Sequence, residues 1–206
     1  MLARKTERGS GPFTFEDYLV WEAEQEEKWE LVDGYAVRRS DRWHWDPATG
    51  KAGATRAHNI VLANLIRHLG NGLAGGPCRA LPSDIKTRSP TGSGRYPDVT
   101  VESGEGEISS LMSAEPRVLL EVLSPSNTRS NLFRLLEDYQ AVPSVAQIVY
   151  LEQNRTFANS WTREAEGWRR VEVEGPGAVL DFPSLNVSVT LRQVYEGLPF
   201  AEEAAA

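Results

Sequence analysis

Two acidic residues stand inside apolar, strand-like runs of this chain. Asp98 lies in residues 96–101 (YPDVTV) and Glu121 lies in residues 117–123 (RVLLEVL). A carboxylate in an apolar strand is costly unless its charge is compensated, and a metal ion is a common compensation. Because side chains alternate along a strand, the two carboxylates converge if the strands lie side by side with these faces turned the same way. An alternative fits these residues equally well: Asp98 is a turn residue after Pro97, and Glu121 pairs with a structural arginine.

The first interpretation suits a hard divalent cation. Two carboxylates, a main-chain carbonyl and water are the oxygen ligands that Mg²⁺ prefers, commonly shared with a substrate phosphate. Such an ion polarises a phosphoryl oxygen and activates water for attack on phosphorus. Two further residues belong to this hypothesis, the acid Glu30 at the edge of a predicted hairpin and His58 on a predicted helix.

The predicted elements alternate between helices and strands, as in a mixed-sheet α/β fold. Thr14 caps a first helix, and Asp33-Gly34 joins the strands of a hairpin. On the second helix His58 falls within the apolar stripe and therefore faces the sheet. The expected helices cover residues 15–21, 56–69, 127–141 and 191–195, with the glycine-rich residues 70–76 ending the second. The expected strands cover residues 29–32, 35–37, 78–81, 84–88, 96–101, 117–123, 145–151, 155–163, 168–174 and 185–189.

Length and composition predict one globular domain outside the membrane. The chain has 206 residues, of which 40% are hydrophobic and 25% are charged, and this suffices for a sizeable core. No run approaches the roughly 18 apolar residues that span a bilayer, and no secretory signal is expected. The single Cys78 excludes an internal disulfide and fits a cytoplasmic location. We expect a flexible arm over residues 1–12, one domain over 13–198 and a tail over 199–206.

Several short motifs, in order along most of the chain, resemble the Uma2 family of the PD-(D/E)XK nuclease superfamily. Residues 29–34 (WELVDG) are similar to the family's early hairpin, and residues 58–61 (HNIV) to its helix histidine. Residues 83–88 with 96–99 resemble the strand pair that carries the PD motif. Residues 121–126 (EVLSPS) match a further family motif.

The resemblance implies a restriction-endonuclease-like core with flanking helices and an N-terminal β-hairpin. It also implies an endonuclease that uses Mg²⁺ or Mn²⁺ to hydrolyse phosphodiester bonds in DNA. Asp98, Glu121 and the carbonyl of Val122 would be the metal ligands, and Glu30 and His58 further members of the catalytic site. Since cleavage of both strands favours a symmetric pair, a homodimer is the expected assembly. The net charge of −7 does not itself indicate nucleic-acid binding.

The lysine that the superfamily uses to orient water has no counterpart at the expected positions. The third residue of the E-x-K motif is Leu123, and the helix position used in Uma2-like sequences is Leu135. Lys86 or Arg129 could substitute, although solvated positions are favoured for both, and Arg134 is expected to face solvent. The alternative function is therefore a catalytically inactive nuclease-fold protein that acts as a binding or assembly module.

Other motifs carry less weight. No G-x-S-x-G elbow, P-loop or dinucleotide fingerprint occurs. His44 and His68 are interpreted as structural. Trp43 and Trp45 could stack on bases, but packing is the more ordinary expectation.

Overall fold

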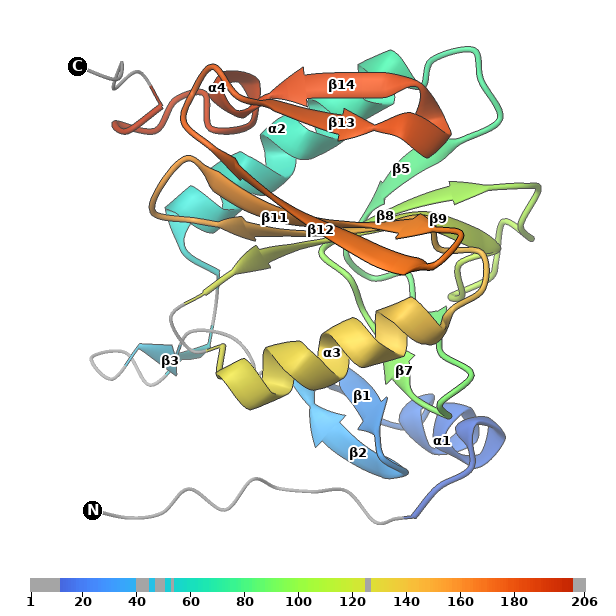
Figure 1. Ribbon diagram of the computed structural model, residues 1–206. Coiled ribbons are helices and arrows are strands. Elements are labelled where there is room, and N and C mark those ends of the chain that lie inside the picture. The colour runs from blue at the N-terminus through green and yellow to red at the C-terminus, as the bar shows by residue number, and fades with distance from the viewer. Residues whose placement is uncertain (1–11, 40–44, 47–50, 53, 125–126, 202–206) are drawn as a thin grey trace.

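A six-stranded mixed sheet forms the centre of the protein (Figure 1). The computed structural model describes residues 12–39, 45–46, 51–52, 54–124 and 127–201. The strands are β5 (Arg79–Pro82), β8 (Val99–Ser103), β9 (Glu115–Leu123), β10 (Gln147–Glu152), β11 (Phe157–Glu164) and β12 (Gly167–Glu174). Their order is β12-β11-β10-β9-β8-β5. In this sheet β9 and β10 are parallel, and the other neighbours are antiparallel.

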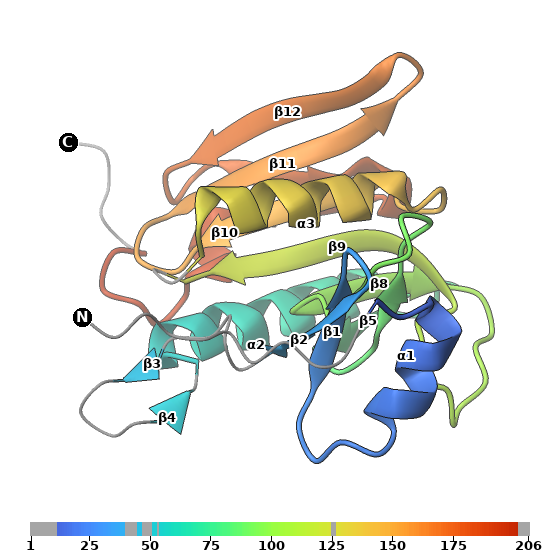
Figure 2. The same ribbon diagram turned by 90° about the horizontal axis from the view of Figure 1, so that it is seen from below.

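Helices cover both faces of the sheet. Helix α2 (Arg56–Gly72) lies on one side of β9 and α3 (Arg129–Ala141) on the other (Figure 2). Helix α3 is the crossover between the parallel strands β9 and β10. Alternation along β9 divides its side chains between the helices: Leu120 packs in the cluster under α2, and Leu119 in the cluster under α3. Glu121 therefore belongs to the α3 face.

Each face has its own apolar core. The α2 stripe is buried as the sequence predicts, and the hairpin of β13 (Val179–Phe182) and β14 (Val187–Thr190) packs beside it with α4 (Leu191–Val194). The α2 cluster includes Val61, Leu65, Leu69, Val101, Leu120, Val149, Leu180 and Val189. The α3 cluster includes Leu119, Leu135, Tyr139, Val145 and Ile148.

A smaller four-stranded sheet and helix α1 (Phe15–Glu22) pack below α3 in Figure 1. The predicted Asp33-Gly34 turn joins its first two strands, with φ angles of 51° and 79° that suit a tight hairpin. Tyr18 and Leu31 are fully buried in its own apolar cluster. Its order is β2-β1-β7-β6, with β1 (Trp29–Val32), β2 (Tyr35–Arg38), β6 (Thr87–Arg88) and β7 (Gly94–Arg95).

The mixed-sheet fold is confirmed, and several elements differ locally from the expected ones. Helix α2 does not end at Leu69 but continues through Gly72, where a Cβ would lie 2.8 Å from Cγ1 of Val187. The glycine is thus explained by close helix–strand packing rather than by helix termination. The strand expected over 84–88 forms only at Thr87–Arg88, with Lys86 in an isolated bridge to Met112. The strand expected over 96–101 begins at Val99, so Asp98 precedes it, as the alternative interpretation of a turn residue after Pro97 allows. Strand β13 was missed, because its four residues carry little periodic signal.

Some predictions fall outside the described residues, namely those on His44 and Trp43 and on residues 1–11 and 202–206. The backbone of Trp45 lies in the two-stranded sheet of β3 (Trp45–Asp46) and β4 (Lys51–Ala52). In the part of the chain that the structure describes, no helix is long and apolar enough to cross a membrane.

We expect replacement of Leu120 by Ala to lower the free energy of unfolding by about 2–5 kcal/mol, because a fully buried side chain in the central strand leaves a cavity. Leu111→Ala is the matched control, since Leu111 is 73% exposed and should change stability by less than about 0.5 kcal/mol. Urea denaturation followed by circular dichroism measures both. Equal effects of the two substitutions would contradict the assignment of Leu120 to the core.

Candidate functional site

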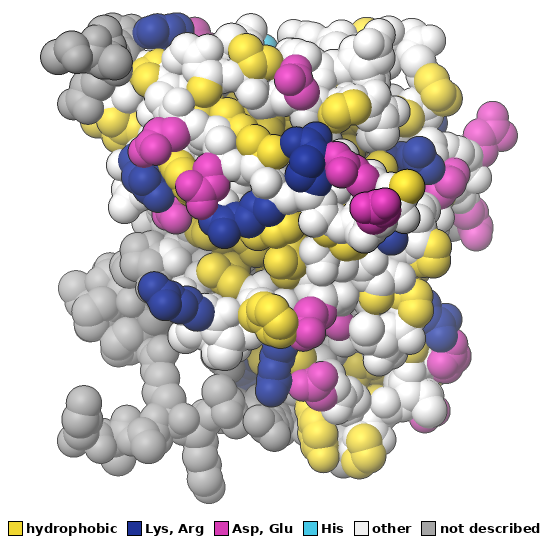
Figure 3. Space-filling model, in the orientation of Figure 1, with side chains coloured by type: hydrophobic (Ala, Val, Ile, Leu, Met, Phe, Trp, Pro, Cys, Tyr) yellow, Lys and Arg dark blue, Asp and Glu magenta, His cyan; other side chains and the backbone are white. Residues whose placement is uncertain are grey.

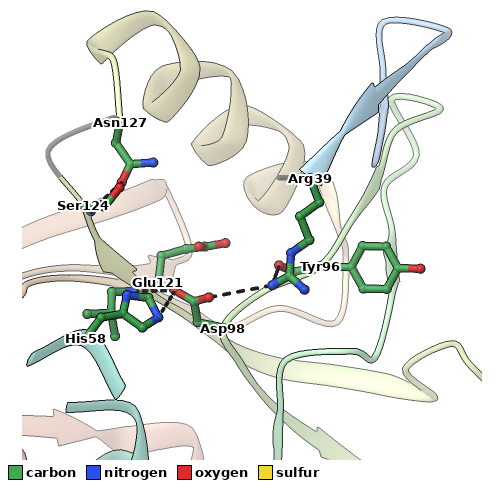
Figure 4. A pocket seen from close by; sticks show the side chains of 8 residues that line it. Arg39, His58, Tyr96, Asp98, Glu121, Ser124 and Asn127 are labelled. Carbon is green, nitrogen blue, oxygen red and sulfur yellow. Dashed lines mark hydrogen bonds and ion pairs between the residues drawn. The ribbon is translucent and has the colours of Figure 1, made fainter. Parts of the chain in front are cut away.

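Asp98 and Glu121 lie in one pocket at the edge of the sheet, with Asp98 just before β8 and not within it. Strands β8 and β9 are antiparallel, and β8 begins at Val99, which lies opposite Leu120, the residue before Glu121. Both side chains line one pocket, together with Val122 and His58 (Figure 4). The convergence that the sequence left conditional is therefore realised in the fold. Two features account for it: β8 starts opposite Leu120, and the backbone N–H of Val122 holds the carboxylate of Asp98 beside β9.

Protein groups surround the carboxylate of Asp98, whose side chain is only 4% exposed. The backbone N–H of Val122 donates to Oδ2 at 2.9 Å. Nε2 of His58 lies 3.8 Å from the same oxygen, and Nη2 of Arg39 lies 3.8 Å from Oδ1. Each carboxylate oxygen thus faces a nitrogen that can carry positive charge, and this lowers the cost of burial.

Glu121 is held by α3, the helix on the face of the sheet opposite to α2. The hydroxyl of Tyr139, on α3, donates to Oε1 at 2.5 Å. Tyr139 itself is fully buried in the cluster under α3. The hydrogen bond therefore fixes the carboxylate against the helix that follows its own strand.

His58 is positioned by the first turn of α2. Thr55 caps this helix by accepting a hydrogen bond from the His58 backbone N–H at 3.1 Å. The Thr55 hydroxyl also donates to Oε1 of Gln153, and Nε2 of Gln153 donates to the carbonyl of Leu123 at 3.0 Å. These contacts tie the start of α2 to the ends of β9 and β10. The imidazole consequently reaches the sheet edge beside Asp98.

Burial lowers the pKa of His58 below its ordinary value of 6.5. The charge of Asp98 and a hydrogen bond to the backbone of Val122 raise the pKa, and the charge of Arg39 lowers it. Because burial has the largest effect, the neutral imidazole is favoured near pH 7. A neutral imidazole next to two carboxylates can accept a proton.

Arg39 is the cation of the pocket, and the sequence analysis missed it. It follows β2, is 7% exposed, and its backbone N–H donates to the carbonyl of Lys28. Nη2 donates to the carbonyl of Tyr96 at 3.3 Å, and Nη1 lies 3.5 Å from Oδ1 of Asp84. Strand alternation would place Arg39 on the exposed face with Tyr35, so periodicity could not have revealed it.

Glu30 lies behind the pocket and is not among the residues that line it. Its side chain is fully buried, 3.1 Å from Nη1 of Arg95, and it accepts a hydrogen bond from the backbone N–H of Tyr96 at 3.3 Å. Arg95 also bonds Asp138 on α3, with Nε 2.7 Å from Oδ2. Glu30 thus contacts the site through Tyr96, whose ring lies against Arg39.

Lys86 is neither in the pocket nor on a solvated strand face, the two positions that the sequence analysis considered for it. It is 2% exposed, so it is not solvated, and it does not line the pocket. Its ammonium pairs with Glu22 and lies 4.6 and 5.2 Å from the ring centroids of Tyr18 and Tyr96. Burial lowers the pKa of Lys86, an effect that Glu22 opposes. A closed aromatic cage therefore holds this lysine away from the carboxylates.

The other positions considered for a catalytic cation, on α3 and at the end of β9, are as the sequence predicts. Arg129 is exposed, and Arg134 is exposed and pairs with Asp33 at 2.8 Å. Leu135 is 1% exposed in the α3 cluster, and Leu123 packs against that cluster. Apolar packing thus takes the two positions at which a lysine was sought.

The donor set of the pocket suits a hard cation that keeps several waters. The cavity of about 30 Å³ has room for a water molecule or a small ion. Within the described residues no cluster of three or more His, Cys, Asp or Glu side chains could hold a metal. Two carboxylates are nevertheless sufficient for Mg²⁺, which commonly takes its remaining ligands from water and substrate phosphate.

The chain is similar to known proteins over most of its length. The Uma2 family model, described as "Putative restriction endonuclease", matches residues 15–192. The uncharacterized protein slr1290 of Synechocystis sp. is 28% identical over 198 residues, which are 90% of this chain and 92% of that protein. A crystal structure from Anabaena variabilis, described as a "putative nuclease" of DUF820, superposes with a TM-score of 0.69 at 14% identity and covers 89% of this chain and 98% of that one. At this low identity the likeness shows the fold alone.

Replacing Asp98 by Asn is expected to lower the pKa of His58 further, because a charge that raises it is removed while burial remains. Wild-type His58 should titrate below 6.5, so its contribution to stability is complete above that value and is lost as the pH falls towards the folded-state pKa. An NMR titration of the ring signals in metal-free buffer measures the shift. Asp181→Asn, which changes an exposed carboxylate on β13, is the matched control. A higher His58 pKa in the Asp98→Asn protein would contradict the placement.

Proposed function

This chain belongs to the Uma2 family, and from that premise we propose that it is a metal-dependent endonuclease that hydrolyses phosphodiester bonds in DNA. One observation carries the proposal: Asp98, just before β8, and Glu121, on the neighbouring strand β9, line one pocket with His58 and Arg39. Paired carboxylates beside a proton acceptor and a fixed cation are the groups that phosphodiester hydrolysis needs.

Asp98, Glu121 and the carbonyl of Val122 are the residues that would hold Mg²⁺ or Mn²⁺. The bound ion would supply a Lewis acid to the phosphoryl oxygen and lower the pKa of bound water. The carboxylates would contribute in the ionised form, which the Val122 N–H stabilises at Asp98 and the Tyr139 hydroxyl at Glu121.

His58 takes up the proton of the attacking water in this proposal. The imidazole faces the pocket, and its lowered pKa favours the neutral form that can accept a proton. Asp98, 3.8 Å away, stabilises the imidazolium that results. The hydrogen bond to the backbone of Val122 keeps the ring in place during the transfer.

Arg39 provides the positive charge for the phosphate. The contacts to Tyr96 and Asp84 hold its guanidinium at the pocket wall, where it can donate to phosphoryl oxygens. A guanidinium is planar and permanently charged, so it binds phosphate well but orients water less well than lysine does. We therefore propose slow turnover compared with an enzyme that has the lysine.

Glu30 is proposed as a positioning residue, since it acts through the backbone of Tyr96 and through Arg95.

Figure 3 shows Lys and Arg side chains interspersed with Asp and Glu on one face of the molecule. Because the net charge is −7, DNA binding is proposed to rest on the pocket itself. A cytoplasmic location is also a proposal. The division into an arm (1–12), a domain (13–198) and a tail (199–206) is a further one. Within the proposed tail, Ala201 is buried against the domain.

The second candidate is a nuclease-fold binding module without turnover. It is favoured by Leu123 and Leu135, which pack in an apolar cluster where related sequences were expected to carry lysine. This candidate shares the metal site and the fold with the first. The two differ in whether a phosphodiester bond is broken.

We expect the purified protein to nick supercoiled plasmid in the presence of Mg²⁺ or Mn²⁺, and we expect Glu121→Gln or Asp98→Asn to abolish nicking. Each substitution keeps the size of the side chain and removes the charge that would hold the ion. Glu115→Gln is the matched control, because Glu115 lies on the same strand as Glu121 but is exposed. Titration calorimetry with Mn²⁺ provides a readout that is independent of cleavage.

The outcomes separate the candidates. Nicking that depends on Asp98 supports the endonuclease and excludes the binding module. Metal binding that requires Asp98, without nicking, supports the binding module. Equal nicking by wild type and the Asp98→Asn protein would mean a contaminating nuclease and would refute the proposed site.

Arg39→Ala is expected to reduce the cleavage rate by about 10²–10³-fold, the usual effect of losing one fixed donor to a developing negative charge. Arg38→Ala is the control, because Arg38 precedes it in the chain but pairs with Glu27 at 2.7 Å and does not line the pocket. Single-turnover kinetics at saturating metal measure the rate of the chemical step. Similar rates for the two variants would exclude Arg39 from the reaction.

A further inference from the structure

Strand β12 has an open edge. It is the outermost strand of the six-stranded sheet, and its eight residues pair with β11 in an unbroken register from Gly167 to Glu174. Proteins commonly protect such an edge with proline, a bulge, a very short strand or charged side chains. Strand β12 has no proline or bulge and is eight residues long, and its charged residues carry both signs: Arg169, Arg170, Glu172 and Glu174. The opposite edge strand, β5, has four residues and contains Pro82. Figure 2 shows β12 at the rim of the molecule.

The hydrogen-bond pattern defines which groups face outward. The N–H of Gly175 donates to the carbonyl of Thr156 at 3.0 Å, so the odd-numbered residues here direct their backbone groups towards β11. Backbone groups alternate along an antiparallel strand. The even-numbered residues therefore present N–H and C=O to the open edge: Trp168, Arg170, Glu172 and Glu174.

We propose that β12 pairs antiparallel with β12 of a second copy of this chain, with Val171 on the two-fold axis. In this register Arg170 lies opposite Glu172 of the other copy, twice by symmetry, and Trp168 lies opposite Glu174. The two neighbouring registers that satisfy the backbone place Arg170 opposite Arg170 or Glu172 opposite Glu172. Like charges directly opposite each other are destabilising, so charge selects the register about Val171.

Contacts within one chain prepare this pairing. Arg170 already pairs with its own Glu172, and its Nε donates to Oδ1 of Asn159 at 2.9 Å. Two copies therefore bring together four charges of alternating sign. On the other face of the strand, Val171, which is 37% exposed, meets Val171 of the second copy. The occupant is thus a second copy because the edge is complementary to itself.

The dimer joins two central sheets into one continuous sheet of twice the width. One strand pair buries a modest area, so the association is reversible and depends on concentration. The pockets lie at β8 and β9, away from β12, and each copy keeps a complete site. The interface is consequently independent of whether the pocket cleaves DNA.

Sedimentation velocity over a range of protein concentrations tests the pairing. Wild type is expected to reach a mass of about twice 22.9 kDa. Arg170→Glu and Glu172→Arg should each weaken the dimer at least about tenfold, because each places like charges opposite each other. Both side chains are exposed, so the fold is retained, and circular dichroism verifies this.

Two rescues make the test specific. An equimolar mixture of the Arg170→Glu and Glu172→Arg proteins should form dimers, since each copy then meets opposite charges. The double variant R170E/E172R should also dimerise, because exchanging the two charges keeps opposite signs facing each other in the register about Val171. Arg169→Glu, on the other face of the strand, is the matched control and should leave the dimer intact.

A wild-type protein that stays monomeric at all concentrations would overturn the proposal, as would single variants that dimerise like wild type. Failure of the double variant to dimerise would overturn the register about Val171. None of these results bears on the nicking assay, so the proposed interface and the proposed function can be refuted independently of each other.

Discussion

Compensation of the buried negative charge of Asp98 is the constraint on which the site depends. Its side chain is almost completely buried immediately before the apolar strand β8. The N–H of Val122, the imidazole of His58 and the guanidinium of Arg39 surround it from three separate elements. An ionised carboxylate persists at such a place only when its oxygens are solvated by the protein. The fold is therefore obliged to bring β9, α2 and the end of β2 to one point.

The same requirement explains how the layers are joined. Thr55 and Gln153 fasten the start of α2 to the sheet, and Tyr139 fastens α3 to Glu121. Beside the pocket, Tyr96 lies in the segment that joins β7 of the small sheet to β8 of the large one, and its backbone contacts Glu30 on β1 and Arg39 just after β2 of the small sheet. Each contact that neutralises a buried polar group also connects two elements. The geometry of the site and the packing of the domain thus share the same residues.

Arg39 also sets a limit on the chemistry. It brings a permanent positive charge within 3.8 Å of a carboxylate that is proposed to hold a divalent cation. A fixed guanidinium reduces the attraction of the pocket for the ion and increases its attraction for a phosphate. The balance favours metal and phosphate binding together over metal binding alone. Such a balance is consistent with Mg²⁺ sites that take part of their coordination from the substrate.

The sequence alone predicted the mixed sheet and most of its elements, and it selected Asp98 and Glu121 as candidates, because these depend on local periodicity and on short motifs. It also placed His58 towards the sheet, since helical geometry relates His58 to Val61 within one turn. Only the tertiary structure decided that Glu30 lies behind the pocket, that Lys86 is caged between two tyrosines and that Arg39 is the cation at the site. These three side chains are placed by contacts between residues far apart in the chain. No local pattern encodes such contacts, since the direction of a long charged side chain depends on the partners that surround it.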